Sequence, residues 1–515
     1  MRADDSTTPG RPTPPAPGWM PATAVLTALV TAASLAVAMA PSGVAARTAG
    51  DVAVELPPIP EVALPETIEA VTLPPVTTFT LANGLQVVVV ERRDRPLAYV
   101  LLSVPAGTAQ DDPALPGVAE MTAAMLTKGT DTRSAVDIAR TIESVGGELA
   151  ASVAVEEARI SAAVLAEHVP LAIELVAEVA QRPAFPASEL AILMQQAVAG
   201  VQQQFDDPGA LAALHADQRL YGDRHPLGHF QTVEELRALT PQHLAVFHRR
   251  HYTPQGSRLL VAGDVDPGQV RALVERHFGA WQAAEEARLE LPGAVRLEQS
   301  RVRFVEWPGQ TQVRIELRQP GPPATVDDWL AVSVYNYVLG GGGFASRLME
   351  VVRSRLGQTY DVHTTYAAQA FPAHFSLSTF TRAEEVWSTL EVLRSELRRF
   401  YEEGITAEEL AKAQRFFILG YPMALETLAD VSGSIDRALG SGRGLDWVSE
   451  YPVRVAALTV DDVNQAIRRH FDPERFAVVL LGDPRVLEGA PETIWGVPRS
   501  QLQRVGRTEV PKPSS

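Results

Sequence analysis

The chain has 515 residues, which is too long for one ordinary hydrophobic core and predicts two to four domains. Its 46% hydrophobic and 21% charged residues are typical of a globular protein, and a formal net charge of −17 argues against an extended nucleic-acid interface, which needs clustered Lys and Arg. The chain has no cysteine, which excludes disulfides, thiolate metal sites, a catalytic Cys and a lipid-anchored Cys.

The N-terminus predicts an export signal. Residues 22–40 are uncharged and apolar apart from Thr and Ser, and small residues at Val44-Ala45-Ala46 fit a cleavage site. We therefore interpret residues 1–46 as an export signal, which implies an exported, periplasmic protein. The alternative is an uncleaved anchor, because this segment approaches the length that spans a bilayer. Residues 47–76 are rich in proline and predict an extended linker.

Folded structure is predicted from about Thr77. The segments TTFTL and LQVVVVE flank Asn83-Gly84, which is typical of a strand–turn–strand unit, and AYVLLSV predicts a further strand. Residues 148–166 alternate between apolar and polar in the manner of strands. Helical patterns begin near Gly117, Ser134, His168 and Pro186.

An internal repeat indicates duplication. ALTPQHLAVFHRRHYTPQGSRLLVAGD begins at Ala238, and ALTVDDVNQAIRRHFDPERFAVVLLGD aligns with it without a gap from Ala457, an offset of 219 residues. Each copy predicts a Thr cap, an amphipathic helix, a turn at Pro and a buried strand. This period is too long for a solenoid and indicates two duplicated domains. We place them at 77–290 and 301–495, with a linker at 291–300 and a tail at 496–515 that is predicted to be polar and disordered after about Arg499.

The segment PGVAEMTAAMLTKGT, residues 116–130, has the spacing of a metal-binding helix. It resembles the inverted zinc-binding helix of the insulinase, pitrilysin and mitochondrial processing peptidase family, which reads roughly G-x-A-H-F-x-E-H-M-x-F-x-G-T. The framework residues that match are Gly117, Ala119, Met125, Gly129 and Thr130. The resemblance covers nearly all of residues 77–495. It implies an α+β fold of two duplicated α/β sandwich domains, each a mostly antiparallel sheet packed with helices.

The zinc-binding groups of this family are absent. The resemblance places the first ligand His at Glu120, the catalytic Glu at Ala123 and the second ligand His at Ala124. The family's third ligand, a Glu ahead of a D-D-P-like turn, falls close to Gly200, and no carboxylate occurs between Leu190 and Phe205. One carboxylate without neighbouring donors cannot hold zinc, so we predict no metal and no cofactor in this chain.

Four histidines are possible alternative metal ligands. His225 and His229 form an H-x-x-x-H pair, but the intervening Pro and Gly argue against a helix that would place both on one face. We predict that they are loop histidines. His248 and His251 lack a nearby carboxylate and are predicted to be surface or half-buried structural residues.

The second domain keeps a different element of the family. Residues 340–362, GGGGFASRLMEVVRSRLGQTYDV, resemble the family motif S-R-L-x-x-x-L-R-x-x-x-G-x-x-Y, preceded by a glycine run that is neither a Rossmann fingerprint nor a P-loop. The resemblance implies that Arg353 and Tyr360 hold the substrate backbone and the developing oxyanion of a partner's active site. It also implies a substrate-binding segment at Gly340, Gly341, Gly342 and Gly343. The alternatives are a flexible loop, an Arg353 that pairs with a surface acid and a Tyr360 that packs.

These features predict a zinc-free, non-catalytic subunit of an exported heterodimeric metalloendopeptidase. Its partner would be a catalytic family chain with H-x-x-E-H that carries the zinc, and unfolded peptides would be the substrates. No nucleic-acid partner is expected, and a membrane contact is expected only through an uncleaved N-terminal segment. Two alternatives stay open: a structural or peptide-binding subunit without a catalytic role, and an independent hydrolase with an unrecognised site.

Overall fold

The computed structural model describes residues 62–282, 295–366 and 374–509. The predicted export signal at 1–46 and residues 47–61 of the predicted linker lie outside this part of the chain. Within the described residues, no helix combines the length and the apolar composition needed to cross a bilayer.

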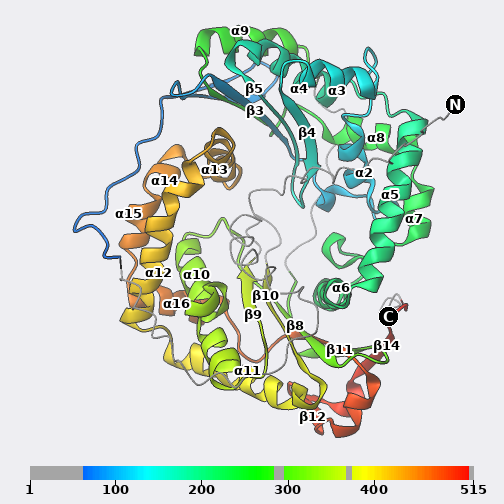
Figure 1. Ribbon diagram of the computed structural model, residues 1–515, viewed down its shortest axis with the longest axis vertical. Coiled ribbons are helices and arrows are strands. Elements are labelled where there is room, and N and C mark those ends of the chain that lie inside the picture. Colours follow the sequence, from blue (N-terminus) through cyan, green and yellow to red (C-terminus); the bar gives the residue numbers. More distant parts are fainter. Residues whose placement is uncertain (1–61, 283–294, 367–373, 510–515) are drawn as a thin grey trace, which may run out of the picture. The chain divides into compact units, whose positions relative to one another are not determined.

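The first half of the described chain is built on a six-stranded sheet (Figure 1). The strand order is β1-β2-β6-β3-β5-β4, and every neighbouring pair is antiparallel except β2 and β6. Strand β2 is apolar on both sides because Val87 and Val89 enter one core while Val88 and Val90 enter another. The strands are β1 (Val76–Thr80), β2 (Gln86–Glu91), β3 (Leu97–Val104), β4 (Glu148–Val153), β5 (Ala158–Leu165) and β6 (Arg258–Gly263).

Helices cover one face of this sheet, with α4 against β3 and β5, and α2 against β4. The four predicted helix starts are confirmed, because Gly117, Ser134, His168 and Pro186 are the N-cap residues of α2, α3, α4 and α5. The helices of the first half are α2 (Val118–Met125), α3 (Ala135–Glu143), α4 (Val169–Gln181), α5 (Ala187–Asp206), α6 (Pro208–Tyr221), α7 (Val233–Ala238), α8 (Pro241–His251) and α9 (Pro267–Phe278).

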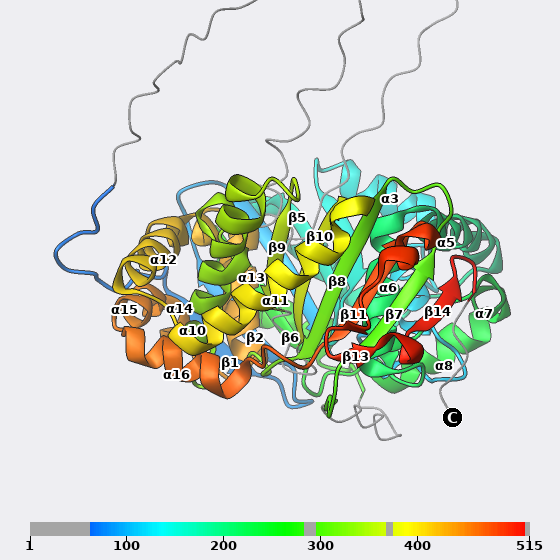
Figure 2. The ribbon, with the colours of Figure 1, turned by 90° about the horizontal axis from the view of Figure 1, so that it is seen from below.

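The second half repeats the architecture with the sheet order β14-β7-β11-β8-β10-β9 (Figure 2). The two sheets and their helices confirm the predicted duplicated α+β fold. The strands are β7 (Arg301–Glu306), β8 (Gln312–Pro320), β9 (Val362–Tyr366), β10 (His374–Arg382), β11 (Ala477–Gly482) and β14 (Gln503–Gly506), with a short hairpin of β12 (Thr493–Ile494) and β13 (Val497–Pro498). The helices are α10 (Trp329–Asn336), α11 (Val386–Glu403), α12 (Ala407–Gly420), α13 (Leu428–Gly440), α14 (Leu445–Ser449), α15 (Tyr451–Ala456) and α16 (Val460–His470).

The sequence repeat corresponds to a structural repeat. Helix α8 followed by β6 matches helix α16 followed by β11, and Thr240 and Thr459 each accept a backbone N–H as the N-cap. The side chain of Asp462 completes a capping box with Thr459. The predicted cap, helix, turn and strand are therefore confirmed in both copies.

Within the predicted tail at 496–515, the prediction of disorder after about Arg499 is wrong for residues 503–506. Residues Gln503–Gly506 form β14, which pairs in parallel with β7 and occupies the sheet position that β1 holds in the first half. Val505 is buried in a core with residues of β7 and β11. A four-residue strand with three polar or glycine residues gives little periodic signal in the sequence. Its position becomes evident only in the folded sheet, where it pairs with the edge of β7 that would otherwise be unpaired.

The later part of the predicted proline-rich linker follows the surface of the second half. Leu64 and Ile68 pack against a core that contains Leu330, Ile418 and Val455. The backbone N–H of Val71 donates to the carbonyl of Ser449 at 2.8 Å. Residues 62–75 have no regular secondary structure, as predicted, but these contacts hold them against the second half.

Each half also contributes one helix to the sheet of the other half. Helix α6 packs on β8 and β11, and helix α13 packs on β3 and β6. Three apolar residues of α13, Val431, Ile435 and Ala438, bury the second face of the first sheet. Full burial of one large apolar side chain contributes about 1.5–3 kcal/mol, so this exchange ties the two halves together strongly.

Equivalent aspartates lie on the two exchanged helices, 219 residues apart in the sequence. Asp436 is fully buried and accepts hydrogen bonds from Arg258 Nε at 2.7 Å and Ser103 Oγ at 2.8 Å. Asp217 accepts from Arg318 Nε at 3.0 Å. Burying a charge is costly unless an opposite charge pairs with it. These contacts therefore also fix the position of each helix on its sheet.

Replacing Asp436 with Ala is expected to lower the free energy of unfolding by about 3 kcal/mol, because Arg258 loses a carboxylate partner in a largely buried site. Urea unfolding followed by circular dichroism measures this change. The control is Asp461→Ala, an exposed aspartate on α16, which should change the free energy by less than about 0.5 kcal/mol. Equal losses in the two variants would contradict the role given to Asp436.

Candidate functional site

The helix that resembles a zinc-binding helix is α2, and a half-buried carboxylate from the loop before it caps its N-terminus. Gly117 is the N-cap residue and has a φ of 82°, a conformation that strongly favours glycine. The two carboxylate oxygens of Asp111 accept the backbone N–H groups of Gly117 at 2.7 Å and Ala119 at 2.8 Å. Asp111 therefore caps α2 from outside the helix, and this contact holds α2 in place without metal.

The four positions of the predicted degenerate zinc site lie on two helices that contact each other, α2 and α5. On α2, Glu120 is exposed, Ala123 is buried and Ala124 is half-buried. Gly200 is exposed on α5, and a Cβ added there would meet no atom within 4 Å. The four residues offer one carboxylate and no imidazole, so this donor set does not fit zinc.

In the part of the chain that the structure describes, no group of three or more His, Asp or Glu side chains is arranged to hold a metal ion. The absence of zinc from this protein stays a prediction, and its physical basis is the donor set at residues 120, 123, 124 and 200.

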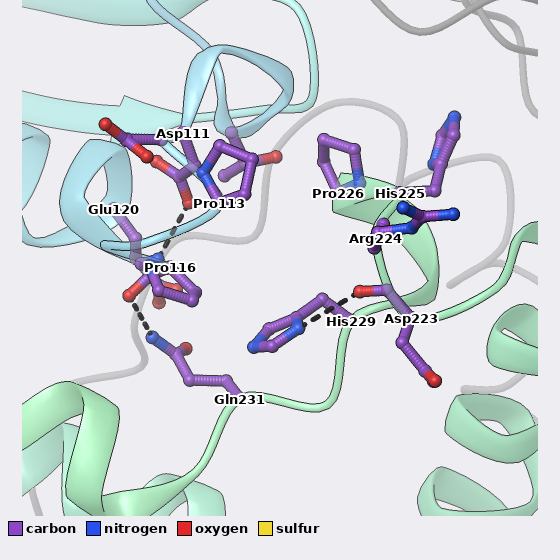
Figure 3. A pocket seen from close by; sticks show the side chains of 13 residues that line it. Asp111, Pro113, Pro116, Glu120, Asp223, Arg224, His225, Pro226, His229 and Gln231 are labelled. Atoms are coloured by element: carbon purple, nitrogen blue, oxygen red, sulfur yellow. Dashed lines mark hydrogen bonds between the residues drawn. The ribbon is translucent and has the colours of Figure 1, made fainter. Parts of the chain in front are cut away.

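A cavity of about 160 Å³ lies beside the N-terminus of α2 (Figure 3). Glu120 lines it together with Asp111 from the loop before α2. On the opposite side, His229 makes hydrogen-bond contacts through Nε2 with Glu235 at 3.1 Å and through Nδ1 with the carbonyl of Asp223 at 3.3 Å. The partners of His229 are thus residues of its own loop and the next helix.

The remaining histidines have structural contacts. His225 stacks on Tyr221 with ring centroids 4.6 Å apart, and its Nδ1 accepts the N–H of Leu227 at 3.1 Å, in agreement with the predicted loop. His248 Nε2 lies 2.8 Å from the carbonyl of Ala180, and burial lowers the pKa of His248 to about 4. His248 and His251 are both buried, so the prediction of a surface or half-buried position is wrong.

Burial raises the pKa of Asp111 to about 7, even though its two backbone N–H donors favour the charged form. The nearby carboxylate of Glu120 acts in the same direction as burial. This raised pKa belongs to the carboxyl group that caps the N-terminus of α2.

Arg353 and Tyr360, the second predicted pair, lie next to each other in the second half. The guanidinium carbon of Arg353 lies 4.6 Å from the ring centroid of Tyr360 and 4.4 Å from that of Phe344. Arg353 belongs to a π-helical segment, Met349–Arg355, a type of helix that is rare and frequent at functional sites. The two aromatic rings hold the cation by cation–π attraction.

Among the described residues, none forms an ion pair with Arg353 within 4.0 Å or accepts a hydrogen bond from its side chain. The side chain of Tyr360 is 61% exposed and that of Phe344 is 72% exposed. The structure therefore contradicts the alternatives in which Arg353 pairs with a surface acid and Tyr360 packs into the protein. The N–H donors of the Arg353 guanidinium could therefore bind an acceptor on another molecule.

The glycine run packs closely against its own surroundings. A Cβ at Gly340 would lie 2.7 Å from the side chain of Thr364, and a Cβ at Gly341 would lie 2.7 Å from Asn336 Nδ2. A Cβ at Gly342 would lie 2.7 Å from the carbonyl of Tyr337. Gly343 has a φ of 55° and turns the chain toward Phe344. Close approach of the backbone explains the glycines, and their role in substrate binding stays a prediction.

Sequence reasoning did not identify Asp111 or Phe344 as parts of these sites. Phe344 directly follows the glycine run, and an aromatic residue between a glycine run and an Arg motif is the signal that could have found it. Asp111 has no local signal, because its bond partners lie six and eight residues further along the chain.

Two family models match the chain. A model for the insulinase family, peptidase family M16, matches residues 86–221, and a model described as the peptidase M16 inactive domain matches residues 238–417.

Relatives with similar sequences cover most of the chain. An uncharacterized zinc protease of Mycobacterium tuberculosis (strain ATCC 25618 / H37Rv) is 31% identical over 412 residues, which is 78% of this chain and 92% of that protein. An uncharacterized zinc protease of Streptomyces coelicolor is 29% identical over 403 residues, 76% of this chain and 86% of that protein. A crystal structure of the peptidase M16 inactive domain from Pseudomonas fluorescens is similar with a TM-score of 0.74 and 29% identity, and covers 79% of this chain and 98% of that one.

Stability measured against pH tests the Asp111 site. Because the pKa of this carboxyl is about 7 in the folded protein and 3.8 is its ordinary value, the folded state holds an extra proton between these pH values. The Asp111 contribution to the free energy of unfolding therefore falls as pH rises from about 4 to about 7. Urea unfolding at several pH values should show this fall in the wild type relative to Asp111→Asn, which cannot titrate.

The control for this experiment is Asp112→Asn, which changes the neighbouring exposed aspartate and keeps the Asp111 carboxyl. It should keep the wild-type pH dependence. A constant difference between the wild type and Asp111→Asn across this pH range would contradict the neutral-range titration of Asp111.

Proposed function

Because the chain belongs to the insulinase (peptidase M16) family, we propose that it is the zinc-free, non-catalytic subunit of an exported heterodimeric metalloendopeptidase. Its partner in this proposal is a second family chain with an intact H-x-x-E-H motif, and unfolded peptides are the substrates. The chain contributes Arg353 and Tyr360 to the substrate and to the transition state. The observation that carries the proposal is the contact of the Arg353 guanidinium with two exposed aromatic rings, without a side-chain hydrogen bond or ion pair to any residue that the structure describes.

The chemistry of the pair fits peptide hydrolysis. The carbonyl oxygen of a peptide bond gains negative charge when water attacks its carbon, and preorganised donors stabilise this charge. A guanidinium has several N–H donors in a fixed plane, and a phenol adds one O–H donor. The zinc of the partner would activate the water. Arg353 and Tyr360 would orient the carbonyl and stabilise the oxyanion.

The residues at the zinc positions support a non-catalytic role for this chain. Glu120 is the one possible donor at the four positions, and Ala123 is buried where the resembled motif has its base. The model described as an inactive domain matches residues 238–417, which do not include these four positions. Relatives that are named zinc proteases show that hydrolysis belongs to the family, and the partner chain is where we place it.

Export is part of the proposal and is supported by the uncharged segment at residues 22–40 and the small residues that follow it. A second candidate function is peptide binding without a catalytic contribution. The exposed rings of Phe344 and Tyr360 favour it, because a peptide could bind on these rings without any bond cleavage.

Arg353→Ala is expected to lower kcat/KM for peptide cleavage by the mixture of this chain and its zinc-bearing partner by about 100-fold, since one oxyanion donor is worth about 3 kcal/mol. Tyr360→Phe removes only the phenol O–H and should lower kcat/KM by about tenfold or more. A fluorogenic peptide assay with the partner in fixed amount measures both effects.

The matched control is Arg355→Ala, which removes an exposed arginine of the same helical segment that pairs with Glu350. It should leave kcat/KM unchanged within about twofold, because surface ion pairs contribute little. Unchanged cleavage in Arg353→Ala and Tyr360→Phe would reject the catalytic contribution and favour the second candidate function.

The purified chain is expected to retain less than about 0.1 zinc ion per molecule after dialysis, because one carboxylate without imidazole neighbours binds zinc weakly. Elemental analysis by mass spectrometry measures the content, and the partner chain with H-x-x-E-H is the positive control with about one ion. Stoichiometric zinc in this chain would favour an independent hydrolase.

A further inference from the structure

The second half exposes an aromatic surface, which we define by Tyr337, Phe344, Tyr360, Phe416, Leu419 and Met423. Five of these side chains are exposed apolar or aromatic residues, at 72% for Phe344, 61% for Tyr360, 60% for Met423, 46% for Phe416 and 42% for Leu419. Isolated exposed apolar residues are common in soluble proteins, but a group of large ones on neighbouring elements is not.

Contacts join the members of this surface. Phe416 stacks on Tyr337 with ring centroids 4.6 Å apart, and a Cβ at Gly342 would lie 3.0 Å from the ring of Tyr337. Phe344 follows the glycine run directly and contacts Arg353, which in turn contacts Tyr360. The surface is therefore continuous from Tyr360 through the glycine run to helix α12.

Helix α12 extends the surface. Leu410, Ala413 and Ile418 are buried and hold this helix to the protein, and Phe416 adds its stacking contact with Tyr337. Phe416 and Leu419 are three residues apart and lie on one side of the helix. Met423 lies beyond the end of α12, in the 3-10 helix Tyr421–Leu425.

Positive charge borders the surface, in a chain whose net charge is −17. Arg353 lies at one end, and Lys412 and Arg415 lie close enough to Tyr337 to lower the pKa of its phenol, against the larger raising effect of burial. Two acids of this region are paired, Glu408 with Lys412 at 2.8 Å and Asp361 with His363 at 2.9 Å. A ligand with large apolar side chains and a carboxylate would complement this combination.

We propose that the aromatic surface binds an extended peptide segment that carries two or more large apolar side chains next to an acidic residue. The inference rests on the proposed function, because it takes Arg353 as a contact of the peptide, and it adds a sequence preference. Two copies of this chain are a less suitable occupant, because strongly negative molecules repel each other.

Binding to the isolated full-length chain tests the proposal without a partner. The probes are three fluorescein-labelled twelve-residue peptides: one with Leu, Phe and Glu, one with its apolar residues changed to Ser, and one with its Glu changed to Lys. Fluorescence anisotropy should show binding of the first peptide and about tenfold or more weaker binding of the other two. Equal affinity for the three peptides would overturn the proposal.

The test variant is Phe416→Ser/Leu419→Ser, in which both residues are exposed and the fold should persist. It should bind the first peptide about tenfold or more weakly. The matched control is Val136→Ser/Ile192→Ser, which removes two apolar side chains that are 63% and 53% exposed in the first half. The control should bind like the wild type. Unchanged binding in the test variant, with circular dichroism spectra alike, would overturn the proposal.

Two measurements separate this inference from the proposed function. Sedimentation of the wild type and of Phe416→Ser/Leu419→Ser shows whether the surface joins two copies, and a dimer that the substitutions dissociate would overturn peptide binding as its role. Arg353→Ala tested for peptide cleavage addresses the proposed function. Preserved peptide binding with no effect of Arg353→Ala on cleavage would reject the catalytic role alone.

Discussion

The fold depends on the exchange of one helix between its two halves. Helix α13 covers the second face of the first sheet, and α6 packs on the second sheet. Without this exchange, the alternate residues of β2 would expose Val88 and Val90 to water. The buried charge of Asp436, paired with Arg258, adds specificity because an unpaired charge at this place would be costly. The two halves thus form one unit, in which a motion that separates them would expose both sheets.

Helix α2 is held by Asp111 at its N-terminus and by the buried side chains of Val118, Met121 and Met125. Capping and packing thus position the helix, and the residues at positions 120, 123 and 124 offer a single carboxylate, that of Glu120. The assignment of these positions to a degenerate zinc site stays a prediction.

In the second half, close packing creates an exposed site. The glycines allow the backbone to pass so close to Thr364, Asn336 and Tyr337 that a Cβ atom would clash with them. This path presents Phe344 to solvent, where it contacts Arg353 together with Tyr360. A cation held by two rings stays charged and keeps its donors, which suits the recognition of a carbonyl or carboxylate oxygen. The proposed catalytic contribution and the proposed peptide preference both depend on this arrangement.

The sequence by itself determined the duplicated fold, the helix starts and the capped repeat at Thr240 and Thr459. These features have local signals, because periodicity, caps and short motifs act over a few residues. The tertiary structure decided the place of β14, the burial of His248, the cap that Asp111 provides and the aromatic surface. Each of these depends on which distant segments meet, and a side chain's burial and partners are set by that meeting rather than by its neighbours in the sequence.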